Sequence, residues 1–372
     1  MRNARVLVVG GGIAGMVTAL CLRRAGVAAE LVERDADWRA LGAGLTINGA
    51  TMRALDRIGL LKDLLPLCAY GDSRQLRTGD DKLIFEQTTT GRYGPGIPMI
   101  GGVLRPEFHR YLQRAVNAAG VPVRLGIAVT GVANVADGVA VTFADGSTVH
   151  YDAVIGADGA GSELRTQLFP GFEGPQYTGQ GTWRAVLRRP ADVIGTRMYF
   201  GHQMVGVNPV SATHMYLFLL QNMPERTWID PSEWLPRLRE QLTEFGGLIA
   251  RLRDELDEQS QINYRPLDAY VLPAPWYRGN VLLLGDAVHG TTPHAGFGAG
   301  LCIEDGMILA ELSRTASGNA EWFEAFMARR FVRASTITRA TIAIGELEKR
   351  HPPATELAAA IRDLQAMIEK EP

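Results

Sequence analysis

The amino-acid sequence predicts an α/β fold in which a Rossmann-like domain is interleaved with a mostly antiparallel sheet and followed by C-terminal helices. Three short apolar runs, at residues 5–9, 153–155 and 281–284, each lead into a glycine-rich turn and a helical pattern. That succession is typical of parallel strands covered by helices. Between these units, residues 72–102 and 177–270 show short alternating pieces broken by Gly, Pro and Thr, which favours antiparallel strands, apart from one helix predicted over 231–256.

The size and charge of the chain favour a protein that handles a small molecule. Its 372 residues suffice for two domains, and 46% of them are hydrophobic. Lys and Arg (38) nearly balance Asp and Glu (40), so no strong field selects nucleic acid or an anionic membrane. A small neutral or weakly acidic ligand fits this balance better.

Cysteine usage and the lengths of the apolar runs predict a cytoplasmic protein. Cys21, Cys68 and Cys302 have no metal-ligand spacing, and an odd number makes a poor disulfide framework. No apolar run reaches the length of a membrane span, and the N-terminus enters a folded pattern within five residues, which leaves no room for a signal peptide. We therefore expect neither a metal site nor a membrane segment.

The first glycine-rich turn predicts a dinucleotide site. Strand 5–9 runs into Gly-x-Gly-x-x-Gly, and a helical pattern follows to Gly26. The first glycine makes the tight turn, the second lets backbone reach a pyrophosphate, and the third lets the helix pack on the strand. A second strand, 29–32, ends in an acid placed to hold a ribose diol. The candidate cofactor contacts are Gly10, Gly12, Ile13, Ala14, Gly15 and Glu33.

Residues after Glu33 supply weaker candidates for the same site. Arg34 and Arg39 are either solvated surface charges or neighbours of the cofactor or of a visiting nicotinamide. Gly44, just before a helix predicted at 49–58, either packs its backbone on a flat ligand or makes a plain tight turn.

Two later segments offer a basic and an acidic candidate. Arg105 begins a predicted helix that ends at Gly120, and it is either a surface charge or reaches cofactor phosphate or ribose. Strand 153–155 leads into Gly156-Ala-Asp158-Gly159, a second strand end with a glycine-flanked aspartate. Asp158 is either a turn former or a ligand-facing carboxylate, and the second interpretation is more economical.

The third unit is the most informative stretch. Residues 281–284 predict a strand buried on both faces, and Asp286 places a carboxylate at the tip, where open α/β sheets bind ligands. Three glycines between 296 and 300 precede a helical pattern over 301–312. A helix N-terminus favours negative charge, so the ligand should carry or develop one, as a reduced flavin does. The alternative is an ordinary turn with Asp286 as an N-cap.

Taken together, these motifs resemble the single-component FAD-dependent aromatic hydroxylases of the para-hydroxybenzoate hydroxylase fold. The resemblance rests on Gly10-x-Gly12-x-x-Gly15 with Glu33, on segment 156–165, and on Leu284-Gly-Asp286-Ala-Val-His289 with the residues up to Asp305, and it spans roughly residues 5–345. It implies three parts: a discontinuous FAD-binding domain at 1–71, 103–175 and 276–318, a substrate domain at 72–102 and 176–275, and a C-terminal helical segment at 319–372.

The resemblance also implies roles by position. Glu33 would hold the adenosine ribose, and Arg105 would lie on the cofactor side. Asp286 would contact the ribityl-pyrophosphate region, and Asp158 both FAD and the pyridine nucleotide. Pro293 would lie beside the isoalloxazine. The backbone that would face the flavin pyrimidine edge is that of Gly296, Gly298 and Ala299.

The implied reaction is hydroxylation of a small aromatic or heteroaromatic substrate. NADH or NADPH would reduce FAD, molecular oxygen would form a C4a-hydroperoxide, and an electrophilic OH would pass to the ring where water is excluded. Two alternatives stay open: a flavin reductase or dehydrogenase without productive oxygen transfer, and a non-catalytic, redox-responsive flavoprotein. The substrate's identity, the choice of nucleotide, and monomer against homodimer are also open.

Candidates for the substrate side come from strand assignments alone. A histidine such as His214 would deprotonate a phenol or hydroxypyridine, or it would be a satisfied structural histidine. Arg184, His214 and Pro293 are the catalytic candidates. The full set on the predicted substrate sheet is Arg184, His202, Gln203, His214 and Tyr216.

Overall fold

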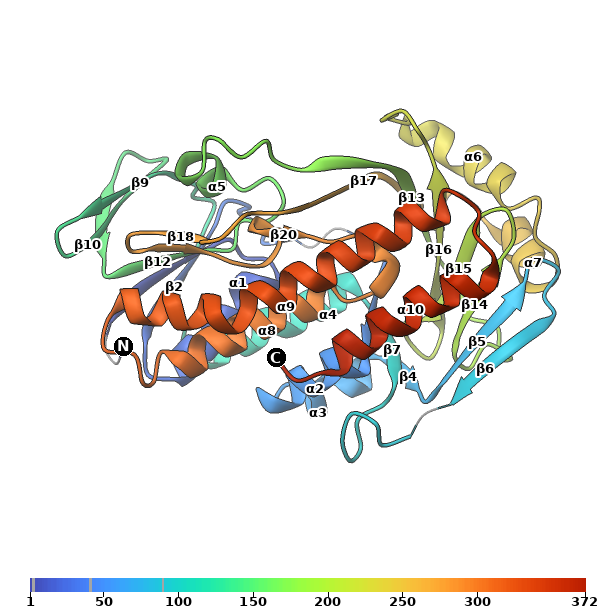
Figure 1. The fold of residues 1–372 in the computed structure, drawn as a ribbon, viewed down its shortest axis with the longest axis horizontal. Coiled ribbons are helices and arrows are strands. Elements are labelled where there is room, and N and C mark those ends of the chain that lie inside the picture. The colour runs from blue at the N-terminus through green and yellow to red at the C-terminus, as the bar shows by residue number, and fades with distance from the viewer. Residues whose placement is uncertain (2–3, 40–41, 89) are drawn as a thin grey trace.

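The computed structural model describes residues 1, 4–39, 42–88 and 90–372, and one end of the molecule holds a six-stranded sheet (Figure 1). Its strand order is β18-β19-β12-β1-β2-β8, parallel throughout except for the β18–β19 hairpin. These strands are β1 (Arg5–Val9), β2 (Ala28–Glu33), β8 (Val123–Leu125), β12 (Ala153–Gly156), β18 (Tyr277–Arg278) and β19 (Val281–Leu283).

Helices follow the strand tips of this sheet. Helix α1 packs against both α4 and α8, so three segments far apart in the sequence form one layer. The helices of this part are α1 (Ile13–Arg24), α2 (Gly49–Arg57), α3 (Leu61–Leu64), α4 (Arg105–Ala118), α5 (Glu163–Leu168) and α8 (Gly298–Leu312). Short 3-10 turns lie at η1 (Leu65–Leu67), η3 (Gly285–Ala287) and η4 (Pro293–Ala295).

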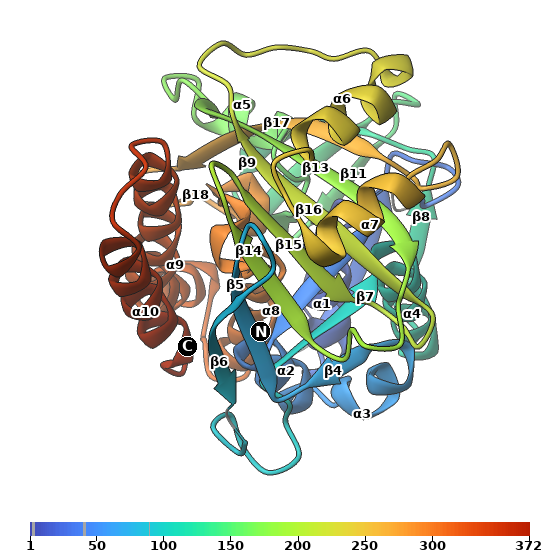
Figure 2. The ribbon, with the colours of Figure 1, turned by 90° about the vertical axis from the view of Figure 1, so that its right-hand side faces the viewer.

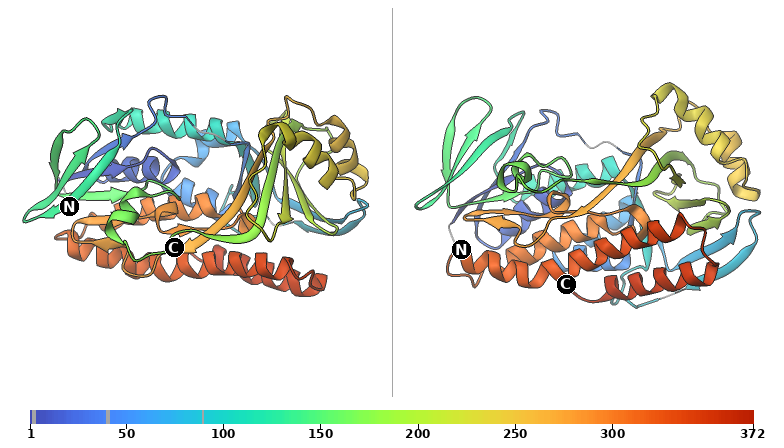
Figure 3. Two further views of the ribbon diagram at one scale, coloured as in Figure 1. Left: turned by 90° about the horizontal axis from the view of Figure 1, so that it is seen from above. Right: turned by 45° about the horizontal axis from the view of Figure 1, so that its top comes forward.

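The second large sheet has eight strands and is antiparallel except where β14 meets β5. Its order is β20-β17-β13-β16-β15-β14-β5-β6. Figure 3 shows β13 and β17 running side by side from one part of the molecule to the other. The strands are β5 (Ser73–Thr78), β6 (Leu83–Thr88), β13 (Gln176–Arg188), β14 (Thr196–Phe200), β15 (Met204–Pro209), β16 (His214–Asn222), β17 (Asn263–Val271) and β20 (His289–Gly290).

Alternation along these strands divides the sheet into two faces. Trp183, Leu217 and Leu219 point to the face that packs on helices α6 (Trp234–Gln241) and α7 (Gly247–Glu255). Because successive side chains alternate, their neighbours face the opposite side, where the candidate site lies. With the parallel sheet, this mostly antiparallel sheet confirms the predicted fold class.

Two small sheets and two long helices complete the structure. The sheets are β3 (Gly44–Asn48), β7 (Ile100–Leu104) and β4 (Ala69–Gly71) in one, and β11 (Thr148–Tyr151), β10 (Gly138–Phe143) and β9 (Val129–Val135) in the other. Helices α9 (Asn319–Glu348) and α10 (Ala354–Glu369) lie side by side along one flank (Figures 1 and 2). None of the helices described combines the length and apolarity that crossing a membrane requires.

The structure corrects some predicted boundaries. The single helix expected over 231–256 is a 3-10 turn, η2 (Pro231–Glu233), followed by α6 and α7. The break falls at Gly246-Gly247, where Gly247 has a φ of 53° that favours glycine. Helix α8 begins at Gly298, three residues before the predicted start. Strands β9 and β15 were not predicted.

Candidate functional site

One cavity of about 810 Å³ is lined by loops and helix starts that follow strands of the parallel sheet, by the large antiparallel sheet and by α10. We call its two parts by what lines them. The glycine-lined half comprises Gly12, Ile13, Ala14, Gly44, Arg105, Asp286, Pro293, Gly296, Gly298 and Ala299. The sheet-lined half comprises Thr182, Arg184, Thr196, Met198, Met204, Tyr216, Phe218, Asn263, Arg265 and Leu267. Most of the predicted cofactor contacts therefore share one cavity with the antiparallel sheet.

The three glycines of the first turn serve different purposes. Gly10 has a φ of 108°, and a Cβ there would stand 2.4 Å from the Ala157 carbonyl oxygen. A Cβ on Gly15 would stand 1.8 Å from the Gly10 carbonyl oxygen. Gly12 lines the cavity and has nothing within 4 Å of such an atom. Two glycines thus permit close packing, and the third leaves space for a ligand.

Two helix N-termini open into the glycine-lined half. Helix α1 starts after Gly12 and α8 after Phe297, and neither has a side-chain cap. The unpaired N–H groups and the positive end of each helix dipole therefore face the cavity. Gly296, at a φ of 55°, turns the chain into the start of α8. A ligand with one anionic group near each helix, as FAD has in its pyrophosphate and reduced pyrimidine edge, fits this arrangement.

Asp286 turns its carboxylate to the cavity rather than capping a helix. Within the described residues its one recorded hydrogen-bond donor is the Cys302 thiol, at 3.8 Å. Burial by the surrounding protein raises the pKa of Asp286, and His289 and Arg105 partly offset that rise. A carboxylate that accepts few hydrogen bonds from the protein can accept them from the hydroxyl groups of a ribityl chain.

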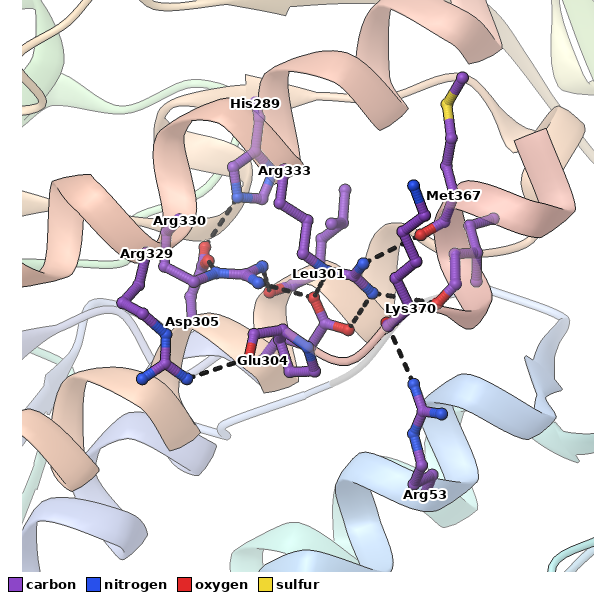
Figure 4. Close-up of polar contacts among 12 residues, drawn as sticks. Arg53, His289, Leu301, Glu304, Asp305, Arg329, Arg330, Arg333, Met367 and Lys370 are labelled. Atoms are coloured by element: carbon purple, nitrogen blue, oxygen red, sulfur yellow. Dashed lines mark hydrogen bonds and ion pairs between the residues drawn. The ribbon is translucent and has the colours of Figure 1, made fainter. Parts of the chain in front are cut away.

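A buried ionic cluster holds the start of α8 in place (Figure 4). Asp305 accepts hydrogen bonds from Gly285 N at 2.9 Å, from His289 Nε2 at 2.7 Å and from Arg330 Nε at 2.7 Å. Burial opposes ionisation of Asp305, but Arg330 and His289 outweigh it and lower its pKa to about 2. Glu304 pairs with both Arg330 and Arg333 at 2.7 Å. The cluster fixes the loop bearing Asp286 against the helix that follows it.

Five predicted cofactor residues lie outside the cavity lining, namely the two closely packed glycines of the first turn, Gly10 and Gly15, and three polar residues, Glu33, Arg34 and Asp158. Glu33 accepts from Gly11 N at 2.6 Å and Asp35 N at 2.8 Å, so both its oxygens support the turn, and its ribose role stays a prediction. Arg34 is 69% exposed and pairs with Glu163, as a surface charge would. Asp158 accepts from Ser162 Oγ at 2.6 Å and Leu164 N at 3.1 Å. These bonds match the turn-forming interpretation that we considered less economical.

Arg39 and Arg105 reach the cavity from its rim. Arg39 lines it while pairing with Asp35 and Asp37 at 3.3 Å. Arg105 is exposed and lies beside Gly42, whose Cβ position is 3.1 Å from the arginine Cδ. The Arg105 guanidinium, with no ion pair among the described residues, is thus available to phosphate or ribose, whereas Arg39 would have to share its charge with two aspartates, and the roles of both stay predictions.

On the antiparallel sheet, Arg184 and Tyr216 face the cavity. Arg184 has no acidic or hydrogen-bonding partner among the described residues, and burial lowers its pKa. The Tyr216 hydroxyl shares a short hydrogen bond with Thr46 Oγ1. Asn208 Nδ2 also donates to Thr46 Oγ1, at 3.0 Å. Burial raises the Tyr216 pKa. These two side chains therefore offer one cation and one neutral phenol to the cavity.

His202, Gln203 and His214 do not face the cavity. His202 and Gln203 lie in the turn between β14 and β15, where their backbone N–H groups donate to Glu244. His214 is exposed at the start of β16 and bonds Thr213. His214 is thus not placed to act on a ring in the cavity, because it stands at the far end of its strand, opposite the exposed Arg188.

The prediction missed the contribution of α10 and of β5. Residues at helical spacing on α10 line the cavity, although residues 319–372 were predicted only as a C-terminal helical segment without a part in the site. The spacing was visible in the sequence, but nothing there indicated which surface it covers. The missed lining residues include Arg74 on β5, Gln87 on β6, and Ile361, Leu364, Gln365, Ile368 and Glu369 on α10.

Comparisons with known proteins decide the family. The model of the family described as FAD binding domain matches residues 3–340. The chain is 30% identical over 358 residues to 6-hydroxynicotinate 3-monooxygenase of Pseudomonas fluorescens, covering 91% of this chain and 90% of that protein. This chain belongs to the FAD-dependent monooxygenases. It is also 29% identical to FAD-dependent urate hydroxylase of Mycolicibacterium vanbaalenii, covering 82% and 78% of the two chains.

Solved structures of FAD-dependent monooxygenase fold agree with the architecture. HpxO of Klebsiella pneumoniae, crystallised with FAD and uric acid, matches with a TM-score of 0.85 at 23% identity over 99% of this chain and 93% of its own. PqsL of P. aeruginosa, in complex with 2-aminobenzoylacetate, matches with a TM-score of 0.83 at 20% identity, covering 97% and 100%. The enzyme is thus an FAD-dependent monooxygenase in family, cofactor and fold.

Proposed function

We propose that this enzyme uses NADH or NADPH to hydroxylate a small aromatic or heteroaromatic substrate. The observation that carries the proposal is a single cavity in which two uncapped helix N-termini face an enclosed sheet surface of mixed aromatic, apolar and basic side chains. Two relatives whose names state a substrate act on hydroxynicotinate and urate, both nitrogen heterocycles. A planar ring of that size fits a cavity of about 810 Å³ that also admits an isoalloxazine.

The proposal divides the chain by task. Residues 1–71, 103–175 and 276–318 hold FAD, residues 72–102 and 176–275 hold the substrate, and residues 319–372 close the site as helices. Bound FAD supplies the redox chemistry, in which a C4a-hydroperoxide delivers one oxygen atom to the ring. The protein's own contribution is to bind, to orient and to exclude water.

Within this scheme the described side chains have distinct tasks. The N-terminus of α8 stabilises negative charge that develops on the reduced cofactor. Asp286 accepts from cofactor hydroxyls, and Pro293 fixes the loop beside the reacting ring. Arg184 pairs with an anionic or carbonyl group of the substrate, and the Tyr216 hydroxyl is positioned to exchange a hydrogen bond with a ring substituent.

The pyridine nucleotide is proposed to visit rather than to reside. The chain has one Gly-x-Gly-x-x-Gly turn in a strand-turn-helix setting, and it serves the FAD site. The exposed guanidinium groups of Arg39 and Arg105 lie at the cavity rim, where they can pair with nucleotide phosphate.

The experiment is a substrate screen on the FAD-loaded protein. NADH and NADPH oxidation are recorded with 6-hydroxynicotinate, urate, 4-hydroxybenzoate and related acids, and products are identified by mass spectrometry. We expect at least one ring compound to accelerate oxidation and to gain one oxygen atom. Nucleotide oxidation that yields only hydrogen peroxide with every compound would instead support a flavin reductase, and no reduction by either nucleotide would support a redox-responsive flavoprotein.

A further inference from the structure

Arg74 is a cation at the cavity wall with neutral partners. It stands on β5, on the face that lines the cavity, and its Nη2 donates to Gln87 Oε1 at 2.9 Å. With the Gln365 amide oxygen turned towards it, that oxygen accepts from Nη2 at 2.6 Å and from Nη1 at 3.0 Å. The Arg74 Nε is buried and has no partner among the described residues.

Arg74 has no counterion among the residues that the structure describes. No ion pair within 4.0 Å is recorded for it among the described residues, and none of the five residues outside that description is acidic in sequence. The acid of the cavity wall on this side, Glu369, is already engaged by Arg92 Nη2 at 2.6 Å and by the Tyr93 hydroxyl at 3.3 Å. Burial accordingly lowers the pKa of Arg74.

Two amide oxygens do not compensate a buried charge. Removing a guanidinium from water costs several kcal/mol, and an opposite charge offsets more of that cost than neutral acceptors do. The cavity as a whole repeats the imbalance, because six arginines line it against two carboxylates, those of Asp286 and Glu369. An arginine that lines a ligand cavity without a counterion is best explained by an anion that arrives with the ligand.

The position of Arg74 separates it from Arg184. Arg184 stands on β13 and Arg74 on β5, which are four strand steps apart in the sheet, or about 19 Å at ~4.8 Å per step. Arg184 lies close enough to Arg105, at the glycine-lined half, for the two charges to interact, whereas Arg74 lies beside α10 through Gln365. Arg74 and Arg184 are therefore placed to contact different parts of a ligand.

We propose that Arg74, Gln87 and Gln365 form a carboxylate-binding subsite that selects substrates bearing an anionic group remote from the ring to be hydroxylated. This inference rests on the proposed function, because it assigns a recognition element to the same cavity. Gln365 comes from α10, so the subsite exists only when that helix lies against the sheet. Binding of an anionic substrate group should therefore favour the position of α10 against the sheet.

The test compares acids with their own amides on FAD-loaded protein. Benzoate, phenylacetate and 3-phenylpropionate are titrated beside benzamide, phenylacetamide and 3-phenylpropionamide, and binding is followed by perturbation of the flavin spectrum and by equilibrium dialysis. We expect at least one acid to bind about tenfold or more tightly than its amide, since tenfold corresponds to ~1.4 kcal/mol, within the range of a charge-assisted hydrogen bond.

The variants locate the preference. Arg74→Met should abolish the preference for acid over amide and leave the FAD content unchanged. Arg74→Lys keeps the charge and should retain part of the preference. It also serves as the second variant if Arg74→Met does not fold. Gln365→Leu should weaken the preference. The matched control is Arg188→Met, an exposed arginine at the end of β13 outside the cavity, which should preserve it.

Several outcomes would overturn the subsite. These are equal affinity for acid and amide in the unmodified enzyme, binding of neither, an unchanged preference in Arg74→Met, or loss of the preference in Arg184→Met alone. A raised KM for NADPH in Arg74→Met with acid binding intact would assign the anion to the nucleotide phosphate instead. Binding of acids and amides is measured without turnover. A substrate screen that finds no hydroxylation would therefore contradict the proposed function without deciding whether the carboxylate-binding subsite exists.

Discussion

Backbone lines much of the glycine-lined half of the cavity, whereas side chains line the sheet-lined half. In the first, Gly12, Gly296 and Gly298 present main chain and helix N-termini to the ligand. In the second, alternate residues of an antiparallel sheet project into the space, Arg184 and Tyr216 among them. A site built from backbone tolerates few residue types, so its glycine motifs can be recognised in the sequence. A side-chain-built site can change residue by residue without changing the fold.

The support of the two halves differs as well. Behind the glycine-lined half stands the ionic cluster of Glu304, Asp305 and Arg330, in which every charge has a partner. In the sheet-lined half, Arg184 has none among the residues described. We infer that charges behind the first half maintain structure and that charges in the second half recognise ligand. Four predictions test this contrast.

The largest effect is expected from Arg330→Met. The variant removes the arginine partner of buried Asp305 and leaves buried Glu304 with Arg333 alone, which should lower the free energy of unfolding by about 3–5 kcal/mol. Urea denaturation of the FAD-loaded protein measures the change. Arg329→Met, a partly exposed neighbour, should shift the midpoint little. Equal losses in the two variants would contradict a structural role specific to the cluster.

The next effect concerns Gly12→Val. A side chain there enters open space at the cavity, so the fold should persist while FAD affinity falls about 100-fold, or ~2.7 kcal/mol. Apo-protein unfolding and FAD titration separate the two quantities. Gly171→Val also adds a side chain where nothing lies within 4 Å, but away from the cavity, and should bind FAD normally. Retained FAD affinity in Gly12→Val would remove Gly12 from the cofactor site.

Arg184→Met should show the reverse pattern. Since Arg184 has no partner to leave unpaired, the melting temperature should stay level or rise. Substrate-stimulated NAD(P)H oxidation should fall about 10- to 100-fold, as loss of one charge-assisted contact implies. The reference is Arg188→Met, on the same strand but exposed. A large stability loss with activity intact would make Arg184 structural and erase the contrast between the halves.

The smallest effect is a pH dependence at Asp305. Its pKa is about 2 in the folded protein, below the ordinary 3.8, so its contribution to stability is present above pH 4 and is lost as pH falls towards 2. Stability should drop over that interval with a slope of up to ~1.4 kcal/mol per pH unit from this group. Asp305→Asn should lack that part of the slope, whereas Asp363→Asn, exposed on α10, should keep it.

The same contrast explains how far sequence reasoning reached. Gly10 and Gly15 pack as the motif predicts, because a Cβ at either position would clash with a main-chain oxygen, whereas Gly12 meets open space and its pyrophosphate role stays a prediction. Arg184 and Tyr216, predicted on the substrate sheet, line the cavity, whereas His214 does not, because it lies at the end of β16 beyond the cavity although its parity along the strand matches that of Tyr216. Arg74 was missed because its significance depends on Gln365, almost 300 residues away in the chain.

Strand β20 has a bearing on how reactants enter and leave. Its two residues pair with β17, His289 with Val271 and Gly290 with Tyr270, and they immediately precede the loop that carries Pro293. The large antiparallel sheet is thereby hydrogen-bonded to the segment that leads into the cavity-lining loop at Pro293. A hinged separation of the two large sheets would break these hydrogen bonds. Entry and exit of reactants should therefore depend on displacement of α10, which is attached to β5 by side chains alone.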